Sequence, residues 1–336
     1  MKKLSLLPAI LAVLALSALV FAPDMSFAAG NHSSAEPTSS NRPLNMDPMT
    51  GSYPGRNVTF GIYDPASAFA GAGDIDIEHM YVFWQALDRR AFKARLSYAE
   101  SRNRTIMVTV EPYTRAVNWR DGGDHLFRDI VKGKFHREIK TICSELGAFK
   151  GDVLVRWGHE MEDANGRYPW ARKDAKGYKS AYRHFVKDCR RYVPDASFVW
   201  SPKGEKNLAD YYPGPETVDL IGLSLYGLEK MDVDYYGGRR DFVSTLREKY
   251  VRIARFQQPV IIAELGVSGS RKYRENWFQS LFDTVRTGTR EFNLLRSIVY
   301  FNDKEPYHWP LGLGSPDWRI VPGSAWFRKA QLSAKN

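Results

Sequence analysis

From residue 57 onward, short apolar runs rich in β-branched and aromatic residues alternate with longer amphipathic stretches. This alternation is typical of repeated strand–helix units, in which helices cover a parallel sheet. We predict eight strands, at residues 58–63, 77–84, 105–111, 152–157, 197–200, 220–224, 259–264 and 296–301. We predict helices at residues 87–102, 124–146, 175–192, 240–256 and 275–290. The fold class is therefore α/β, and eight such strands favour a closed (β/α)8 TIM barrel over an open sheet.

The beginning of the chain has the pattern of a secretory signal peptide. A basic start is followed by an apolar run over residues 4–22 and by small residues that end at Ala28. An uncleaved membrane anchor is the alternative, because the apolar run approaches the length that spans a bilayer. Pro8 and the small residues favour cleavage after residue 28, with no stable membrane insertion afterwards. We therefore expect a secreted or periplasmic protein.

The remaining chain is organised as a linker and one domain. Residues 29–56 are rich in Ser, Asn, Pro and Gly and lack apolar periodicity, which predicts a flexible linker. Residues 57–330 form the predicted single barrel domain, which we expect to be a monomer. Cys143 and Cys189, the only cysteines, fit a disulfide between helices or two buried thiols equally well.

The formal net charge of +10 raises the question of a polyanionic partner. Lysine and arginine are scattered over helix-like stretches, and after the first residues the chain has no block of like charge. A solvated basic surface is the favoured interpretation, and a polyanion-binding site is the alternative. We do not expect nucleic acid as a partner.

Polar residues follow the predicted strands where a barrel would collect them on one rim. Glu111, His159, Glu160, Tyr226 and Glu264 all stand at or near such strand ends. Barrel enzymes carry out their chemistry at this rim. Because glycoside cleavage with retention needs one carboxyl as acid and a second as nucleophile, Glu160 and Glu264 are candidates for the two roles.

Other kinds of active site lack their sequence signatures. A zinc protease motif would need a second histidine four residues after His159, but Asp163 stands there. The histidines show no other metal-ligand spacing, and the chain has no Gly-x-Ser-x-Gly elbow, phosphate-binding loop or Gly-x-Gly-x-x-Gly turn. We therefore predict neither a metal nor a cofactor.

Two of these segments resemble the motifs of one enzyme family. Residues 156–170, Arg-Trp-Gly-His-Glu-Met-Glu-Asp-Ala-Asn-Gly-Arg-Tyr-Pro-Trp, resemble the signature of glycoside hydrolase family 26. The family's general acid/base falls on Glu160. Residues 262–266, Ile-Ala-Glu-Leu-Gly, resemble its nucleophile segment, which implies this role for Glu264.

Further segments extend the resemblance over roughly residues 57–325. Residues 108–113 are similar to the family's third-strand segment, and residues 223–227 to a sixth-strand segment whose tyrosine, here Tyr226, contacts the nucleophile. The resemblance implies a retaining endo-β-glycosidase that hydrolyses a β-linked polysaccharide, β-mannan or a related β-glycan, by two-glutamate double displacement. The alternative is a catalytically inactive barrel that binds a polysaccharide during its export or assembly.

Some positions depart from the family pattern. Residues 162–164 intervene in the signature, Arg167 stands where many members carry tryptophan, and residues 300–302 lack a tryptophan often found there. These changes concern the rim and leave both glutamates in place. Substrates other than mannan, such as mixed-linkage β-glucan or β-1,3-xylan, are therefore consistent with the chain.

The implied mechanism assigns a protonation state to each glutamate. Glu160 must hold a proton near neutral pH, which requires a raised pKa, whereas Glu264 must be ionised to attack the anomeric carbon. Tyr226 could donate its hydroxyl to Glu264 or simply pack with a backbone partner. His159 could orient a carboxyl or be a buried structural residue.

The other candidates are substrate-binding residues. Arg156 is either a donor to the substrate or a buried ion-pair partner of Glu160 or Glu111. Trp170 and Tyr113 lie within the family-like motifs and are candidates for stacking on sugar faces, and Glu111 is a rim carboxylate expected to contact substrate.

Overall fold

The computed structural model describes residues 58–115, 125–163, 167–171, 173–286 and 291–322. In these ranges the strands pair in parallel in sequence order and close into one barrel. They are β1 (Thr59–Tyr63), β2 (Ile77–Phe83), β3 (Thr105–Glu111), β4 (Val153–Trp157), β5 (Ser197–Trp200), β6 (Leu220–Leu228), β7 (Val260–Ser268) and β8 (Leu295–Phe301). The predicted (β/α)8 barrel is confirmed. The predicted signal peptide (1–28) and linker (29–56) lie outside the described residues.

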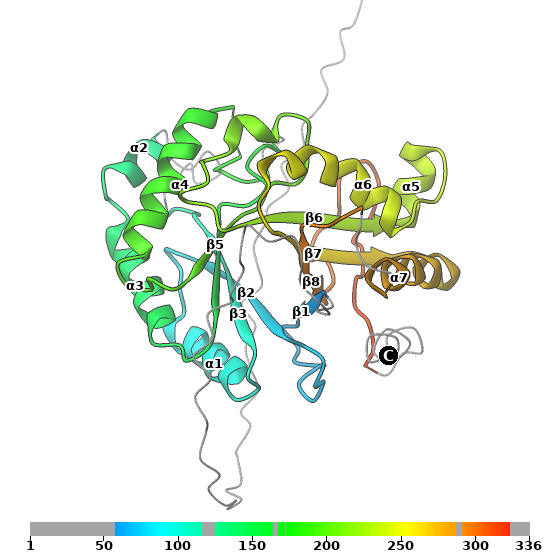
Figure 1. Ribbon diagram of the computed structural model, residues 1–336, viewed down its shortest axis with the longest axis horizontal. Helices are drawn as coiled ribbons and strands as arrows, with labels where there is room; N and C mark the ends of the chain where they lie inside the picture. Colours follow the sequence, from blue (N-terminus) through cyan, green and yellow to red (C-terminus); the bar gives the residue numbers. More distant parts are fainter. Residues whose placement is uncertain (1–57, 116–124, 164–166, 172, 287–290, 323–336) are drawn as a thin grey trace, which may run out of the picture.

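Helices cover much of the outer face of the barrel, but in the described residues none lies between β1 and β2 (Figure 1). They are α1 (Arg89–Glu100), α2 (Leu126–Val131), α3 (His136–Gly147), α4 (Ala175–Cys189), α5 (Glu229–Tyr236), α6 (Phe242–Ile253) and α7 (Arg271–Arg286), with short 3-10 helices η2 (Leu208–Tyr211) and η3 (Ala254–Phe256). None of the helices in these ranges combines the length and the apolar character that a membrane span requires.

The core has two layers, as expected for alternating strand positions. One layer fills the barrel and consists of Ile77, Met107, Leu154, Val199, Leu220, Ile261, Ala263 and Val299. The larger layer lies between strands and helices and contains, for example, Val155, Ile262 and Leu265. Consecutive residues of a strand therefore belong to different layers, which identifies the side chains that point into the barrel.

Aspartates mark the starts of three helices. The Asp88 carboxylate accepts hydrogen bonds from backbone N–H groups in the first turn of α1, and Asp174 does the same for α4. Asp241 forms a reciprocal capping box with Ser244 at the start of α6. Each cap satisfies N–H groups that have no partner within the helix, which fixes where the helix begins.

Several elements differ from the prediction. α7 begins at Arg271, four residues before its predicted start, and α5 lies where no helix was predicted. β6 and β7 continue to Leu228 and Ser268, four residues beyond their predicted ends, because they pair with each other along this extension. The helix predicted at residues 124–146 is two helices, α2 and α3, separated by a turn in which Gly133 has a φ of +78°. Such a left-handed conformation ends a helix and is readily adopted by glycine.

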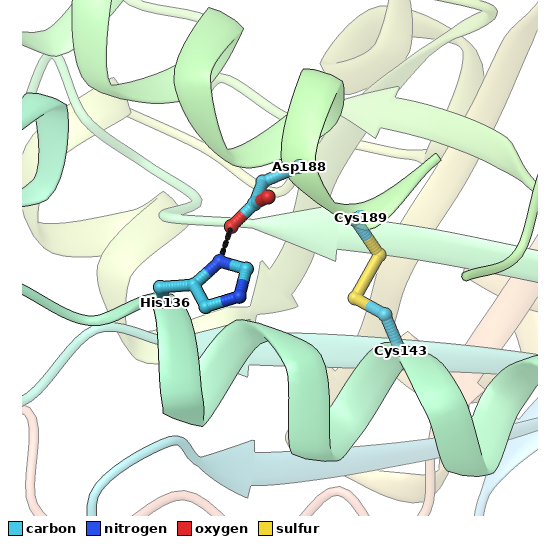
Figure 2. The surroundings of a disulfide bond; sticks show 4 residues. All are labelled: His136, Cys143, Asp188 and Cys189. Atoms are coloured by element: carbon cyan, nitrogen blue, oxygen red, sulfur yellow. Dashed lines mark hydrogen bonds and ion pairs between the residues drawn. A yellow bond between two sulfur atoms is a disulfide. The ribbon is translucent and has the colours of Figure 1, made fainter. Parts of the chain in front are cut away.

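A disulfide between Cys143 and Cys189 joins α3 to the end of α4 (Figure 2). About two helical turns before Cys143, the His136 Nδ1 atom lies 2.6 Å from an Asp188 carboxylate oxygen, so a polar contact also links the same two helices. The sequence left the disulfide and two free thiols as equal alternatives, and the structure has the disulfide.

Removing this disulfide is expected to lower stability markedly. The bond closes a loop with a sequence separation of 46 residues, so its loss in a Cys143→Ala/Cys189→Ala double variant should reduce the free energy of unfolding by about 2–4 kcal/mol. Urea unfolding of the oxidised wild type and the double variant measures this. Equal midpoints and slopes would show that the bond contributes nothing.

Candidate active site

The candidate site lies at the carboxyl ends of the strands, where β4 and β7 supply the two glutamates. β7 carries a bulge just before Glu264: Leu223 pairs with Ile262, but the next residue, Ser224, pairs with Glu264. Ala263 is therefore the extra residue, and its side chain already points into the barrel. In a regular strand the following residue would point outward, so the bulge turns Glu264 inward.

The sequence had predicted Glu264 at the tip of its strand. In the structure Glu264 lies within β7, which continues to Ser268. Its Oε1 atom accepts a hydrogen bond from Arg156 Nη1 at 2.6 Å, and its Oε2 atom accepts one from the Tyr226 hydroxyl at 2.5 Å. Burial alone would raise the pKa of Glu264, but the Arg156 charge and the Tyr226 hydroxyl hold it below its ordinary value. Glu264 is therefore an ionised carboxylate at neutral pH.

Arg156 is the inward-pointing cation of β4. Its side chain has no exposed surface, and its Nη1 atom also donates to Thr109 Oγ1 at 3.2 Å. Of the two predicted roles, that of buried ion-pair partner is correct, but the partner is Glu264 and not Glu160 or Glu111. That Arg156 also donates to substrate stays a prediction.

Glu160 follows β4 in an unusual backbone conformation. Gly158 and Glu160 have φ values of +53° and +52°. Residues other than glycine rarely adopt this left-handed backbone region. The Glu160 N–H donates to the Ser201 carbonyl at 2.8 Å, which anchors the turn to the segment after β5. The carboxyl is almost completely buried at 3 % exposure.

The protonation state of Glu160 differs from the prediction. Burial and the Glu264 charge act to raise its pKa, but Arg167, His159 and Lys203 act in the opposite direction, and the pKa lies below its ordinary value. The raised pKa expected for a resting general acid is therefore wrong for the protein without substrate. Local sequence could not reveal this, because Lys203 follows β5 and reaches Glu160 only in the folded chain.

His159 is held by aromatic side chains of the loop after β4. Its Nε2 atom lies 3.1 Å from the Tyr168 hydroxyl, and its carbonyl accepts a hydrogen bond from Trp170 Nε1 at 2.7 Å. Burial, followed by the Arg156 charge, lowers the pKa of His159 well below its ordinary value, so the imidazole is neutral. His159 lies beside Glu160 and is at most 1 % exposed.

Of the two aromatic residues expected to stack on sugars, one is placed differently from the prediction. Trp170 is completely buried and stacks on Tyr168 with ring centroids 4.7 Å apart, so it supports His159 and does not present a face to a ligand. Tyr113 is partly exposed and meets Trp170 edge to face. Tyr113 thus stays a candidate for contact with substrate.

Glu111 ends β3 and lies close to both glutamates. It is 7 % exposed, and burial, together with the charge of Glu264, raises its pKa to about 8. Arg156 and Arg167 act to lower this value but do not outweigh burial. At neutral pH Glu111 therefore holds a proton, which makes its carboxyl a hydrogen-bond donor beside two ionised carboxylates.

The proton on Glu111 predicts a measurable pH dependence of stability. Because its pKa is about 8 in the fold and 4.5 ordinarily, unfolding releases a proton between these pH values, and the free energy of unfolding must fall as pH rises through them. Glu111→Gln stays neutral and is expected to reduce that fall by roughly 2–4 kcal/mol. Urea unfolding at pH 5 and pH 8 measures it, with the exposed Glu291→Gln as control. An equally steep fall in both variants would contradict the pKa of Glu111.

One residue of the site, Tyr81, was missed by sequence reasoning. Tyr81 lies on β2 near Glu264, and burial followed by the Glu264 charge raises its pKa well above the ordinary value. Ile77 points into the barrel, so counting in twos along β2 would have identified Tyr81 as an inward residue near the rim. Trp309, which the sequence also places near the rim as an aromatic candidate, is partly exposed and meets Tyr226 edge to face.

Buried polar atoms without a protein partner gather at this rim. Among the described residues they include His159 Nδ1 and Glu160 Oε2. Such atoms are costly unless a ligand or water satisfies them. A ligand rich in hydroxyl groups can form hydrogen bonds with these atoms, and the partly exposed aromatic rings nearby can contact its apolar faces. In the part of the chain that the structure describes, no three His, Cys, Asp or Glu side chains are grouped to hold a metal ion.

Comparison with known proteins gives one consistent family. The model of glycosyl hydrolase family 26 matches residues 106–283, more than half of the chain. Beta-1,3-xylanase TXYA from a Vibrio species is 26% identical over 114 residues, which are 32% of this chain and 24% of that protein. Endoglucanase H from Acetivibrio thermocellus is 22% identical over 257 residues, 72% of this chain and 26% of that protein. The chain thus spans about a quarter of the length of these relatives.

Solved structures show the same fold. GH26C from Muricauda sp. MAR_2010_75 aligns with a TM-score of 0.59 at 14% identity, covering 84% of this chain and 86% of that one. A modular endo-beta-1,4-mannanase from Cellulomonas fimi aligns with a TM-score of 0.58 at 16% identity, covering 84% and 71% of the two chains. At such identities the likeness concerns the fold alone.

Proposed function

Since this chain belongs to glycosyl hydrolase family 26, we propose that it hydrolyses a β-linked polysaccharide with retention of configuration, Glu264 being the nucleophile and Glu160 the general acid/base. One observation carries the proposal. Two buried carboxyl groups lie at the barrel rim, Glu160 after β4 and Glu264 on β7, and the charge of Glu264 acts to raise the pKa of Glu160. Arg156 and Tyr226 keep Glu264 ionised. An ionised carboxylate beside a second carboxyl is what double displacement requires.

The proposed reaction has two steps. In the first, a Glu264 carboxylate oxygen bonds to the anomeric carbon while the glycosidic bond breaks and the proton of Glu160 passes to the leaving oxygen. In the second, Glu160 takes a proton from water, the water oxygen bonds to the anomeric carbon, and the ester to Glu264 breaks. The net change is hydrolysis of one glycosidic bond.

Glu160 must gain a proton before the first step. Burial is already the largest influence that raises its pKa, and a bound sugar chain that displaces water from the rim would increase it. The exposed Arg167 is the main opposing charge. We expect the Michaelis complex, and not the free protein, to hold the acid form of Glu160.

The proposed substrate is a β-mannan or a related β-glycan cleaved within the chain. Relatives named as a β-1,3-xylanase and an endoglucanase support a β-glycan, and the solved mannanases support the fold on which such enzymes are built. The partly exposed rings of Tyr113 and Trp309 provide apolar faces of the kind that stack on sugars.

A non-catalytic, polysaccharide-binding barrel is the second candidate function. The observation that favours it is the lowered pKa of Glu160, since a carboxylate that never takes up a proton could bind but not protonate a leaving group. Such a protein would retain a polymer without shortening it.

Product analysis distinguishes the two functions. The protein is incubated with mannan, mixed-linkage β-glucan, β-1,3-xylan and an acidic bacterial exopolysaccharide, and reducing ends and chain lengths are measured. Hydrolysis is expected to release short oligosaccharides from at least one polymer, and Glu160→Gln is the inactive control. Binding of a polymer in affinity electrophoresis without any shortening would favour the binding protein.

We also propose that the protein acts outside the cytoplasm, either secreted or in the periplasm. The Cys143–Cys189 disulfide supports this location, because disulfides persist mainly in oxidising compartments. The monomeric state stays a prediction.

A further inference from the structure

The segment of residues 201–205, directly after β5, is bonded to the turn that carries Glu160. The Ser201 carbonyl accepts the Glu160 N–H at 2.8 Å. The Glu162 Oε1 atom accepts the N–H groups of Gly204 and Glu205 at 2.8 and 3.2 Å. Lys203 Nζ lies 2.7 Å from an Asp163 carboxylate oxygen. The 201–205 segment therefore fixes the chain at Glu160 and at the residues that follow it.

Lys249 of α6 binds the same segment from the opposite side. Its Nζ atom donates to the Lys203 carbonyl at 2.8 Å and to the Ser224 carbonyl of β6 at 2.6 Å. β5 ends at Trp200, whereas β6 continues to Leu228, so the edge of β6 loses its neighbouring strand at this height. The ammonium group takes the place of the missing strand and bridges the two chain segments.

The Ser224 carbonyl belongs to the residue that pairs with Glu264. The bulge in β7 lies immediately before this pair, and bulges disturb the regular ladder of hydrogen bonds. A contact that fixes the β6 side of the bulge restricts how β7 can move against it. Lys249 is thus connected to each glutamate through one intermediate segment. It bonds to Ser224, which pairs with Glu264, and to the 201–205 segment, which bonds to Glu160.

Gly204 packs closely against the Lys249 side chain, so the 201–205 segment has little room to move relative to α6. Gly204 has a φ of +102°, and a Cβ atom there would lie 2.9 Å from the Cδ atom of Lys249. Its carbonyl accepts a further hydrogen bond from Arg252 Nη1 at 2.5 Å. Only glycine lets the 201–205 segment lie against the Lys249 stem in this backbone conformation.

We propose that Lys249 is a positioning residue, which sets the separation of the Glu160 and Glu264 carboxyls by linking the 201–205 segment to β6. Its two hydrogen bonds go to backbone carbonyls and not to either carboxyl group. Burial, the main influence, lowers the pKa of Lys249, as expected for an ammonium kept among backbone carbonyls and away from solvent. This inference rests on the proposed two-glutamate mechanism, because only that mechanism makes the separation matter.

Kinetics of three variants test the role. Lys249→Met keeps most of the stem but removes both hydrogen bonds, and we expect kcat to fall by about 10- to 100-fold with KM within about 3-fold of wild type, since small displacements of reacting groups have such effects. Lys249→Arg can still donate to two carbonyls and should recover most of kcat. Arg247→Met, on the same helix, loses only a surface ion pair with Glu291 and should keep wild-type kcat. The rates are measured on whichever polymer the wild type cleaves.

A purely structural role gives a different result. In that case Lys249→Met would lower the melting temperature but keep kcat per folded molecule, which would overturn the proposal, as would a rise in KM at unchanged kcat. If Lys249→Met does not fold, Lys249→Gln, which keeps one donor group, takes its place in the same comparison.

Crystal structures separate this proposal from the proposed function. We expect Lys249→Met to displace the Ser224 backbone and to lengthen the Arg156–Glu264 contact or shift Glu160, whether or not the wild type cleaves a tested polymer. Unchanged positions of both carboxyls would overturn the positioning role. If the wild type shortens none of the polymers but the carboxyl groups are displaced in Lys249→Met, the hydrolase function is overturned and the positioning role stays supported.

Discussion

Glu264→Ala is expected to reduce polysaccharide hydrolysis by at least about 10³-fold, because the proposed covalent intermediate forms on the carboxylate that this change removes. The removed carboxylate is also the hydrogen-bonded partner of the buried Arg156, and an unpaired buried charge destabilises a fold by about 3–5 kcal/mol. Glu264→Gln retains one oxygen, which can still accept from Arg156, whereas its NH2 group replaces the oxygen that faces Tyr226. It should therefore be inactive but lose less stability than Glu264→Ala.

Azide gives this prediction a direct chemical readout. In Glu264→Ala the small anion can occupy the vacated space beside Arg156 and attack an activated aryl β-glycoside, which should yield a glycosyl azide of α configuration. Turnover by the variant at the wild-type rate, or a β-configured azide, would contradict the nucleophile assignment. Glu291→Gln, which alters an exposed carboxylate paired with Arg247, is the matched control and should keep full activity.

The second large effect is expected for Glu160→Ala. Hydrolysis of a polysaccharide should fall by about 10²- to 10⁴-fold, because an alkoxide leaving group needs a proton from a general acid. A 2,4-dinitrophenyl glycoside leaves as a stable anion without protonation, so formation of its glycosyl-enzyme should be far less affected. The test is a burst of dinitrophenol followed by slow turnover. An equal loss of rate on both substrates would argue that Glu160 has another role.

The barrel was predictable because buried parallel strands read as continuous apolar runs. The ends of β6 and β7 were not, since Tyr226 and Gly266 interrupt the apolar run although both strands continue. The break between α2 and α3 depends on one glycine in a stretch that otherwise has helical periodicity. Local pattern thus identified the elements but not where they end.

The candidate site was predictable only in part. Glu160 and Glu264 stand in motifs that the sequence displays, whereas the bond from Arg156 to Glu264 crosses the barrel between β4 and β7. No local pattern encodes such a pairing. The pKa values of Glu111 and Glu160 depend on charges from several loops and on burial, and these exist only once the chain is folded.

The left-handed backbone at Glu160 bears on how this chain has been selected. A glutamate with a φ of +52° is strained by about 1 kcal/mol or more relative to glycine, which adopts this region freely. Random substitution in a barrel under selection for stability alone would tend to replace the glutamate and relieve the strain. A glutamate at this strained position is expected if selection keeps its carboxyl group for chemistry and accepts the loss of stability.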